Sequence, residues 1–326
     1  MKYANAAAFC GMVAILAGCE MQTAAVDSRV RPMHAIASGR GLQSGITPHV
    51  RLYVANRASN TVTVYPESGN GDVFPIDIVG GSRTRLFAPS SLGFDAARRL
   101  YVLNYSSIVV YAAGSRGNRA PQRTIRGNAT KLSNPQALAV DPTGKVYVTN
   151  DPSSGRNITA YAAGANGNVA PVQEIFDSQS VFFIPIGIAH HNGLLYVADQ
   201  GDQSINEYSD QANGPTQPVV VITGVTEPGG IAVDAQGRIY VSESSSIVVY
   251  AASASGPATP LRTISGSLTQ LSIAAGLIVH NSEIAVVNYG NNSITVYPEN
   301  GDGNIPPLRQ IIGPNTELFG PQGVMF

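Results

Sequence analysis

Six polar side chains recur at one place in the chain, each at the end of a short apolar strand. If the strands lie side by side around an axis, these side chains form a ring that faces a ligand near one face of the molecule. Oxygen ligands in a ring could hold Ca²⁺. Alternatively, each side chain caps the backbone of its own loop, as such residues commonly do before turns. The six positions are Asn56, Asn104, Asn150, Asp199, Glu243 and Asn288.

The composition of this ring favours capping over metal binding. Four of the six residues are asparagines, whereas hard cations normally gather several carboxylates. Motifs for a serine nucleophile elbow, a phosphate-binding loop, paired metal cysteines or a zinc-binding His-Glu-x-x-His helix are absent from the sequence. We therefore predict no metal site, no cofactor and no catalytic residues.

Three histidines fall where other parts of the chain carry the first aspartate of a turn. They are His190, His191 and His280, and Asn192-Gly193 beside the first two is itself a strong turn signal. We expect these histidines to be surface turn residues, although a pair of histidines can bind a metal adventitiously.

The strands that carry the six polar residues are copies of one another. They begin at Leu52, Leu100, Val146, Leu195, Ile239 and Ile284, and five of the six continue with Tyr-Val. The starting positions are 44 to 49 residues apart. A period of about 40 to 50 residues is that of a four-stranded propeller blade.

Each copy contains four strands in the same order. An apolar strand that follows a proline comes first, and the Tyr-Val strand comes second. The third strand ends in a tyrosine, as at residues 61–65 and 107–111, and we expect these tyrosines to pack between blades. The fourth strand carries Pro and Arg, as at residues 121–125, which suits an outermost strand because such residues discourage pairing with other chains.

The end of the chain predicts how the ring closes. Residues 320–326 repeat the pattern of a first strand and then the sequence stops, whereas the first copy, from about His49, has no clear first strand. We predict that the last strand completes the first blade. The fold class is then all-β, a six-bladed β-propeller over residues 51–326 closed by strand exchange.

The N-terminal segment indicates export. Lys2 precedes an apolar stretch that is too short to span a bilayer, so residues 1–18 are expected to be a signal peptide. Leu16, Ala17, Gly18 and Cys19 resemble the lipobox of bacterial lipoproteins, which implies that Cys19 becomes a lipidated N-terminus; the alternative is an ordinary signal peptide with a chance cysteine. Residues 19–50 have the composition of a flexible tether.

The resemblance to the lipobox implies a cell-envelope location and membrane attachment through lipid. Because Glu20 and not Asp follows the cysteine, the outer membrane is favoured if the source is Gram-negative.

The charge balance excludes an obvious polyanion-binding protein. Lys and Arg number 20 and Asp and Glu 21, a net charge of −1, so we expect no nucleic-acid partner. We also expect the protein to be monomeric.

The repeats resemble those of the NHL and YVTN propellers, and residues 147–150 match the name-giving motif of the latter. This resemblance implies a scaffold whose members include interaction modules, sugar-lactone hydrolases and lyases. In propeller lactonases the metal ligands converge on the axial channel from the inner strands. The corresponding positions here include no carboxylate: Ser90, Gln136, Ile186, Gly229, Ala275 and Gln322.

The sequence therefore predicts a class of function and not a reaction. The favoured interpretation is a non-catalytic binding or interaction scaffold whose rigid blades present loops to an unknown protein, glycan or small molecule. The alternative is a lactonase-like hydrolase or lyase with its site in the propeller channel.

Overall fold

The strands of this chain carry apolar side chains on both faces. In β1 (Arg51–Asn56), Leu52 and Val54 belong to one buried cluster, whereas Tyr53 and Ala55 belong to another. Successive residues of a strand point to opposite faces of the sheet. A sheet with two apolar faces needs a neighbour on each side, and a closed ring of sheets provides one for every member.

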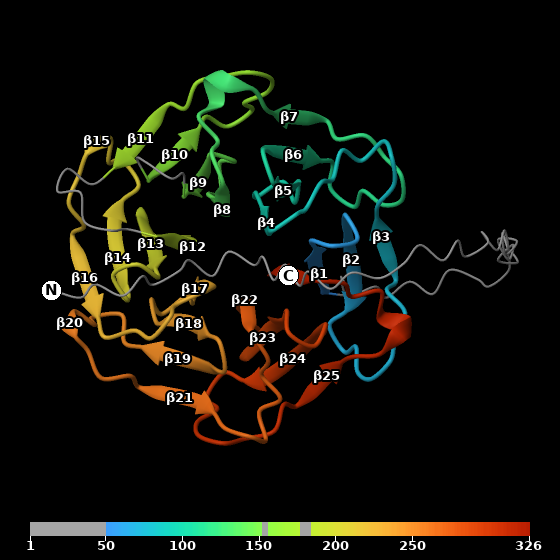
Figure 1. Cartoon of the computed structure of the whole chain (residues 1–326), viewed down its shortest axis with the longest axis vertical. Helices are drawn as coiled ribbons and strands as arrows, with labels where there is room; N and C mark the ends of the chain where they lie inside the picture. Colours follow the sequence, from blue (N-terminus) through green and yellow to red (C-terminus); the bar gives the residue numbers. More distant parts are fainter. Residues whose placement is uncertain (1–49, 152–155, 177–183) are drawn as a thin grey trace, which may run out of the picture. The chain divides into compact units, whose positions relative to one another are not determined.

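The structure, a computed structural model, describes residues 50–151, 156–176 and 184–326. These residues form six sheets arranged around an axis, with the first strand of each sheet nearest the centre (Figure 1). The described helical segments are two short 3₁₀ turns, η1 (Asn128–Thr130) and η2 (Pro314–Thr316). The prediction of an all-β, six-bladed propeller is confirmed.

Each blade is a sheet whose strands follow one another from the axis outward. Blade 1 comprises β26 (Pro321–Met325), β1, β2 (Thr61–Pro66) and β3 (Asp77–Val79). Blade 2 comprises β4 (Ser91–Phe94), β5 (Leu100–Asn104), β6 (Ser107–Tyr111) and β7 (Arg123–Ile125). Blade 3 comprises β8 (Pro135–Val140), β9 (Val146–Asn150), β10 (Asn157–Tyr161) and β11 (Gln173–Phe176).

The other half of the ring repeats this order. Blade 4 comprises β12 (Pro185–His191), β13 (Leu194–Asp199), β14 (Ser204–Ser209) and β16 (Val220–Thr223). Blade 5 comprises β17 (Ile231–Val233), β18 (Ile239–Glu243), β19 (Ser246–Tyr250) and β21 (Arg262–Ser265). Blade 6 comprises β22 (Ala274–His280), β23 (Glu283–Asn288), β24 (Ser293–Pro298) and β25 (Arg309–Ile311). Two further strands, β15 (Gly214–Pro215) and β20 (Gly256–Pro257), join neighbouring blades at the outer rim.

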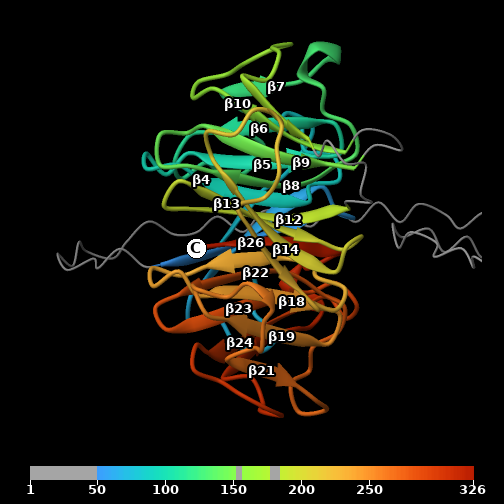
Figure 2. The same ribbon diagram turned by 90° about the vertical axis from the view of Figure 1, so that its left-hand side faces the viewer.

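The ring closes by strand exchange, as the sequence predicts. The last strand, β26, pairs antiparallel with β1, with Val54 opposite Val324 and Tyr53 opposite Met325. On its other side β26 contacts β22 of blade 6, and Figure 2 shows the two strands side by side. The two ends of the described propeller therefore share one sheet, and blade 1 has its inner strand.

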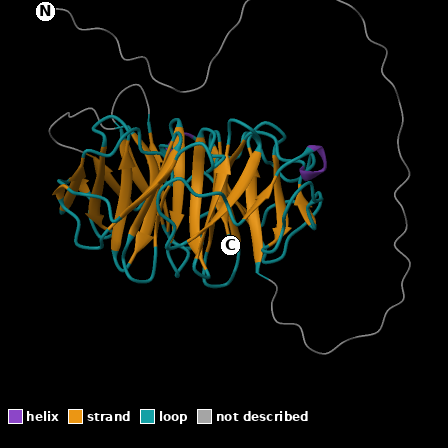
Figure 3. Ribbon diagram, turned by 90° about the horizontal axis from the view of Figure 1, so that it is seen from below, coloured by secondary structure: helices purple, strands orange, loops and turns teal. Residues whose placement is uncertain are grey.

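The core lies between the blades. Six buried clusters account for the six interfaces, one cluster at each. The tyrosine that ends each third strand belongs to the cluster shared with the preceding blade, which confirms the prediction that these residues pack between blades. Seen edge-on, the strands run between two faces that carry the connections (Figure 3).

Backbone pairing joins the outer edges of the blades at every interface. An aliphatic residue of each outer strand forms a parallel bridge with a glycine of the next blade. The six pairs are Ile311 with Gly71, Val79 with Gly117, Ile125 with Gly167, Ile175 with Gly214, Ile222 with Gly256, and Ile264 with Gly303. Because each outer strand finds a partner in the next blade, its edge is not left open.

Four interfaces add a second set of bonds between two turns. We call residues 81–84, 127–130, 266–269 and 313–316 the linker turns; each begins with Gly and ends with Thr. We call residues 116–119, 166–169, 302–305 and 70–73 the rim turns. In each pair, a side-chain oxygen of the rim turn accepts a hydrogen bond of 2.7 to 2.8 Å from the backbone N–H of the third linker-turn residue. The acceptors are Asn118, Asn168, Asn304 and Asp72.

At the same four interfaces, the buried tyrosine of the third strand forms a hydrogen bond to the linker turn. The hydroxyl of Tyr161 donates to the carbonyl of Thr130 at 2.6 Å, and Tyr111 bonds to the carbonyl of Thr84 in the same way. Tyr65 and Tyr297 form the matching bonds to Thr316 and Thr269. Burial, partly offset by a hydrogen bond from Thr159, raises the pKa of Tyr161 to about 12, so the phenol remains a donor at neutral pH.

Candidate functional site

The ring positions end the second strands at one face of the propeller, which we call the linker face because the linkers between blades cross it. The side chains of Asn56, Asn104, Asn150, Asp199 and Asn288 are buried, and Glu243 is half-buried. Each accepts a hydrogen bond of 2.7 to 3.2 Å from a backbone N–H of the linker that leads into an inner strand. The donors are Phe319, Phe87, Ser133, Ile184, Thr226 and Ser272.

The asparagines use their amide groups as well. Asn56 donates to the Thr63 hydroxyl at 2.9 Å, and Asn288 donates to the Thr295 hydroxyl at 3.0 Å. The asparagine at the end of a second strand therefore connects a linker, through its carbonyl oxygen, to the third strand of its own blade, through its amide. This geometry is that of the capping alternative.

Asp199 is the ring residue whose bonding differs most. Its Oδ1 accepts from the backbone N–H groups of Ile184, Gly201 and Asp202 at 2.7 to 3.3 Å. Among the described residues, its Oδ2 has no hydrogen-bond partner, and neither has the Ser204 hydroxyl, which lies opposite it in the sheet. Burial raises the pKa of Asp199 to about 6, with the charge of Asp202 contributing. When protonated, Oδ2 supplies a donor, as the amide does at the asparagine positions.

Exposed aromatic side chains accompany the capped linkers. Phe87 is 63% exposed and lies edge-to-face with Tyr105, 57% exposed, at a centroid distance of 6.2 Å. Phe319 is 59% exposed, and the ring of Tyr289, 43% exposed, lies beside the adjoining Gly320. The backbone N–H groups of both phenylalanines are held by ring residues, so buried bonds fix the positions of exposed rings.

The first residues of the inner strands contact neighbouring blades through their backbones. Gly187, Gly230 and Gly276 lie against the carbonyls of Gly229, Ala275 and Gln322, where a Cβ atom would clash. The Ser90 hydroxyl donates to the Gln136 carbonyl at 3.3 Å, and Ile186 is half-buried at the corresponding position. Close packing between blades therefore explains the small residues at this level.

The expectation that the histidines lie in turns is wrong. His190 and His191 end β12, and His280 ends β22. The turns contain two residues of positive φ, Asn192-Gly193 and Asn281-Ser282, because a two-residue hairpin of this kind matches the twist of the strands. The tighter turn leaves the preceding histidines in the strand.

His190 lies at the face opposite the ring residues. Its Nε2 is 2.9 Å from Asp210 Oδ2, and its ring stacks on Tyr147 at 5.7 Å. Burial acts to raise the pKa of Asp210, but hydrogen bonds from His190 and Gln211 outweigh it and lower the pKa. In the part of the chain that the structure describes, no three His, Cys, Asp or Glu residues are grouped to hold a metal ion.

Several predicted features lie outside the described residues, namely the signal peptide over residues 1–18, the anchor Cys19 and the tether up to residue 49. No helix among the described residues has the length and apolar character needed to cross a bilayer.

Comparison with solved structures identifies relatives in fold. The chain is similar to a protein of unknown function from Bacteroides caccae (TM-score 0.62, 10% identity, covering 84% of this chain and 97% of that one). It is also similar to a chain of a nidogen/laminin complex (TM-score 0.59, 13% identity, 84% and 97% covered). A functionally unknown protein from Desulfotomaculum acetoxidans gives a TM-score of 0.56 at 14% identity, with 86% and 87% covered. Neither a family model nor a curated protein sequence matches the chain. At these identities the likeness shows the propeller fold alone.

The exposed aromatic side chains of the linker face were not predicted from the sequence. A signal for them exists in the repeat itself, because Phe87 and Phe319 occupy the linker position at which other copies carry Ser133 and Ser272. The departure from the repeat at these two positions is therefore the sequence signal that marks this exposed surface.

Proposed function

We propose that this protein is a non-catalytic binding scaffold that presents its linker face to a protein, glycan or small-molecule partner. The observation that carries the proposal is the exposed aromatic side chains of that face: Phe87 in edge-to-face contact with Tyr105, and Phe319 and Tyr289, which lie on either side of Gly320. Aromatic residues are enriched at interfaces because they bury a large area with few rotatable bonds.

The hydrogen bonds beneath this surface support the same role. The N–H groups of Phe87 and Phe319 are bonded to Asn104 and Asn56, both buried. Binding a partner then requires little ordering of the backbone, and less of the interaction free energy is lost to conformational entropy.

Membrane attachment through Cys19 is the second part of the proposal. Its support is the sequence Leu16, Ala17, Gly18, Cys19. A chain anchored in this way would carry its propeller at the bacterial cell envelope. We expect the chain to incorporate labelled palmitate and to fractionate with membranes, whereas Cys19→Ser should do neither. Equal labelling of the variant would contradict the anchor.

The binding role is tested by photo-crosslinking in cells. A photoreactive residue in place of Phe87 or Phe319 should capture one dominant partner, identified by mass spectrometry. Thr143 is exposed in a turn at the opposite face and serves as the control position. Capture of the same species from position 143, or of none from 87 and 319, would overturn the assignment to the linker face.

A matched variant connects capture to the aromatic side chains. Phe319→Ser introduces the residue found at the equivalent position in two other repeats, so the fold should tolerate it. It should reduce capture from position 87 while leaving thermal unfolding unchanged. Elemental analysis of the same purified protein addresses the lactonase-like alternative: a stoichiometric divalent ion that survives dialysis would favour an enzyme.

A further inference from the structure

One of the four linker-turn and rim-turn pairs differs from the others in its side chains. Between blades 1 and 2, the positions around the shared hydrogen bond are Arg83, Arg116 and Arg119. The equivalent residues between blades 2 and 3 are Ala129, Asn166 and Val169, and between blades 5 and 6 they are Leu268, Asp302 and Ile305. The backbone arrangement needs no arginine at any of these positions, since the other pairs form without one.

These arginines belong to a charge asymmetry that the overall net charge of −1 conceals. Residues 83–131 contain eight arginines and one lysine but a single acidic residue, Asp95. Residues 132–326 contain five basic and fifteen acidic residues. Positive charge is therefore concentrated on blade 2 and its flanking linkers, and this part of the ring attracts anions.

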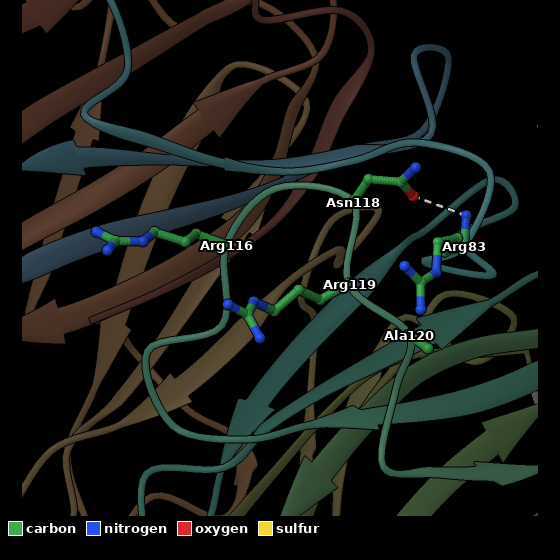
Figure 4. Close-up of a pocket in the computed structure, with 5 residues that line it drawn as sticks. All are labelled: Arg83, Arg116, Asn118, Arg119 and Ala120. Atoms are coloured by element: carbon green, nitrogen blue, oxygen red, sulfur yellow. Dashed lines mark hydrogen bonds between the residues drawn. The ribbon is translucent and has the colours of Figure 1, made fainter. Parts of the chain in front are cut away.

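The three guanidinium groups form few interactions with the rest of the described chain. Among the described residues, those of Arg83 and Arg119 form no hydrogen bond or ion pair. Arg116 is 72% exposed and lies 3.9 Å from Asp77, which already accepts a 2.7 Å bond from Arg51. Figure 4 shows that the Arg116 side chain extends away from Arg83, so the three guanidinium groups share the rim of one hollow without converging on a single point. Like charges on neighbouring turns repel one another, and an anion between them relieves this repulsion.

The arginines line a hollow of about 540 Å³ at the outer rim, together with Asn118 and Ala120. Figure 4 shows Arg116 and Arg119 extending from the rim turn, and Arg83 beside Asn118 from the linker turn. The Arg83 N–H is bonded to Asn118 Oδ1 at 2.7 Å, which fixes the two turns relative to each other. The hollow is open to solvent.

We propose that this hollow, the arginine site, binds a phosphate-bearing small molecule. A carboxylate has two oxygens, and one arginine can donate hydrogen bonds to both. A phosphate group has three or more oxygens in a tetrahedral arrangement, so several arginines can donate to it at once. The site lies at the outer rim, and its lining includes none of the exposed aromatic residues of the linker face, so it stands independently of the binding role proposed for them.

The test is titration calorimetry of the full chain with inorganic tripolyphosphate at 150 mM salt. Saturable binding at one site is expected, and the variant R83A/R116N/R119V should bind at least about tenfold more weakly, because it loses three charge-assisted donors. These replacements are the residues at the neighbouring pair of turns and they remove the repulsion between like charges, so the variant should unfold at or above the temperature of the natural chain. No saturable binding, or equal binding by the variant, would overturn the proposal.

Three controls decide between the arginine site and general charge attraction. Arg126→Ser removes another arginine of the same basic region, outside the hollow, and introduces the residue at the equivalent position, Ser265; it should change the affinity less than threefold. A loss as large as that of the triple variant would contradict a defined site. Citrate should bind more weakly than tripolyphosphate, and equal binding would overturn the choice of phosphate. Phe319→Ser should leave tripolyphosphate binding unchanged, which separates this site from the linker face.

Two further ligands identify the source of the phosphate. Glucose 6-phosphate represents a phosphorylated saccharide, and glycerol 3-phosphate represents a phospholipid headgroup. The ligand with the higher affinity indicates the source, and its binding should depend on the same three arginines. If neither loses affinity in the triple variant, the arginine site is refuted for organic phosphates.

Discussion

The interface between blades 2 and 3 and that between blades 4 and 5 are alike in their apolar packing but differ in their hydrogen bonds. Both contain a buried apolar cluster and a parallel bridge at the outer rim. Between blades 2 and 3, Asn168 also bonds to the linker turn and Tyr161 bonds to Thr130. Between blades 4 and 5, the linker is shorter and passes from Thr223 through Gly224 without a 3₁₀ turn, and Pro257 stands where Asn168 would be.

This difference separates what forms the ring from what strengthens it. Apolar packing and the bridges occur at all six interfaces, whereas the side-chain bonds between linker turns and rim turns occur at four of them among the described residues. The ring can therefore close without those bonds. Blade 4 also carries the carboxylate Asp199 where four other ring positions carry an amide, so the least typical bonding is concentrated around this blade.

The largest effect is expected at the closure. Deletion of residues 320–326 removes β26, and with it Val324 and Phe326 from the cluster between blades 6 and 1. The loss should exceed about 5 kcal/mol of unfolding free energy. Circular dichroism should show a non-cooperative or strongly lowered thermal transition. Phe319→Ser, an exposed change at the residue before this segment, should leave the transition in place. An equally stable deletion protein would refute closure by strand exchange.

Glycine substitutions compare the two kinds of linker. Gly313 has φ 133°, a conformation that only glycine adopts readily, and a Cβ there would meet the Asp72 carboxyl group. Gly313→Ala should cost about 3 kcal/mol. Gly224 has φ 82° with no atom within 4 Å of the added Cβ, so Gly224→Ala should cost about 1 kcal/mol. Urea unfolding measures both, and equal costs would contradict the tighter fit of the linker turns.

Asp199 gives blade 4 a distinct pH dependence. Burial raises its folded-state pKa to about 6, above the unfolded value of 3.8, so between these values the folded chain binds more protons than the unfolded chain. Its contribution to stability is therefore full below about pH 4 and is lost as the pH rises to about 6 and beyond. Asp199→Asn should be more stable than the natural chain at pH 7 by about 2 kcal/mol.

The measurement is the difference in unfolding free energy between Asp199→Asn and the natural chain across pH 4 to 8. Asp95 and Asp234, whose pKa values are lowered by hydrogen bonds from arginine and tyrosine despite burial, change both proteins alike at acidic pH. The difference should grow between pH 4 and 6 and then level. A difference that does not vary with pH would show that Asp199 does not titrate there.

Most of the fold could be predicted because it depends on local patterns repeated six times. The Tyr-Val strands gave the period, and the unmatched first-strand pattern at residues 320–326 gave the closure. Both alternatives for the ring residues, metal binding and capping, could be stated from the sequence. The partners of their side chains could not, because the linker N–H groups that they bind lie 17 residues away in sequence for Asn104 and Asn150 and 263 residues away for Asn56.

The candidate surfaces could not be read in the same way because they form between blades. Arg83 and Arg119 come from different blades and meet only when a rim turn bonds to the preceding linker. The net charge of the whole chain also conceals the positive charge of residues 83–131, because acidic residues elsewhere in the chain balance it. Histidine placement failed for a local reason, since turn length decides whether a residue such as His190 ends a strand or lies in the turn.

The smallest expected effect isolates one hydrogen bond. Tyr111 and Tyr250 end equivalent third strands and are both buried. The Tyr111 hydroxyl donates to the Thr84 carbonyl, whereas that of Tyr250 has no hydrogen-bond partner among the described residues, because the shorter linker lacks the turn that supplies one. Tyr111→Phe should cost about 1 kcal/mol, and Tyr250→Phe should be near neutral. Chemical unfolding of the two variants compares them directly. Equal costs would mean that burial of the ring, and not the bond to the linker turn, accounts for the tyrosine at this position.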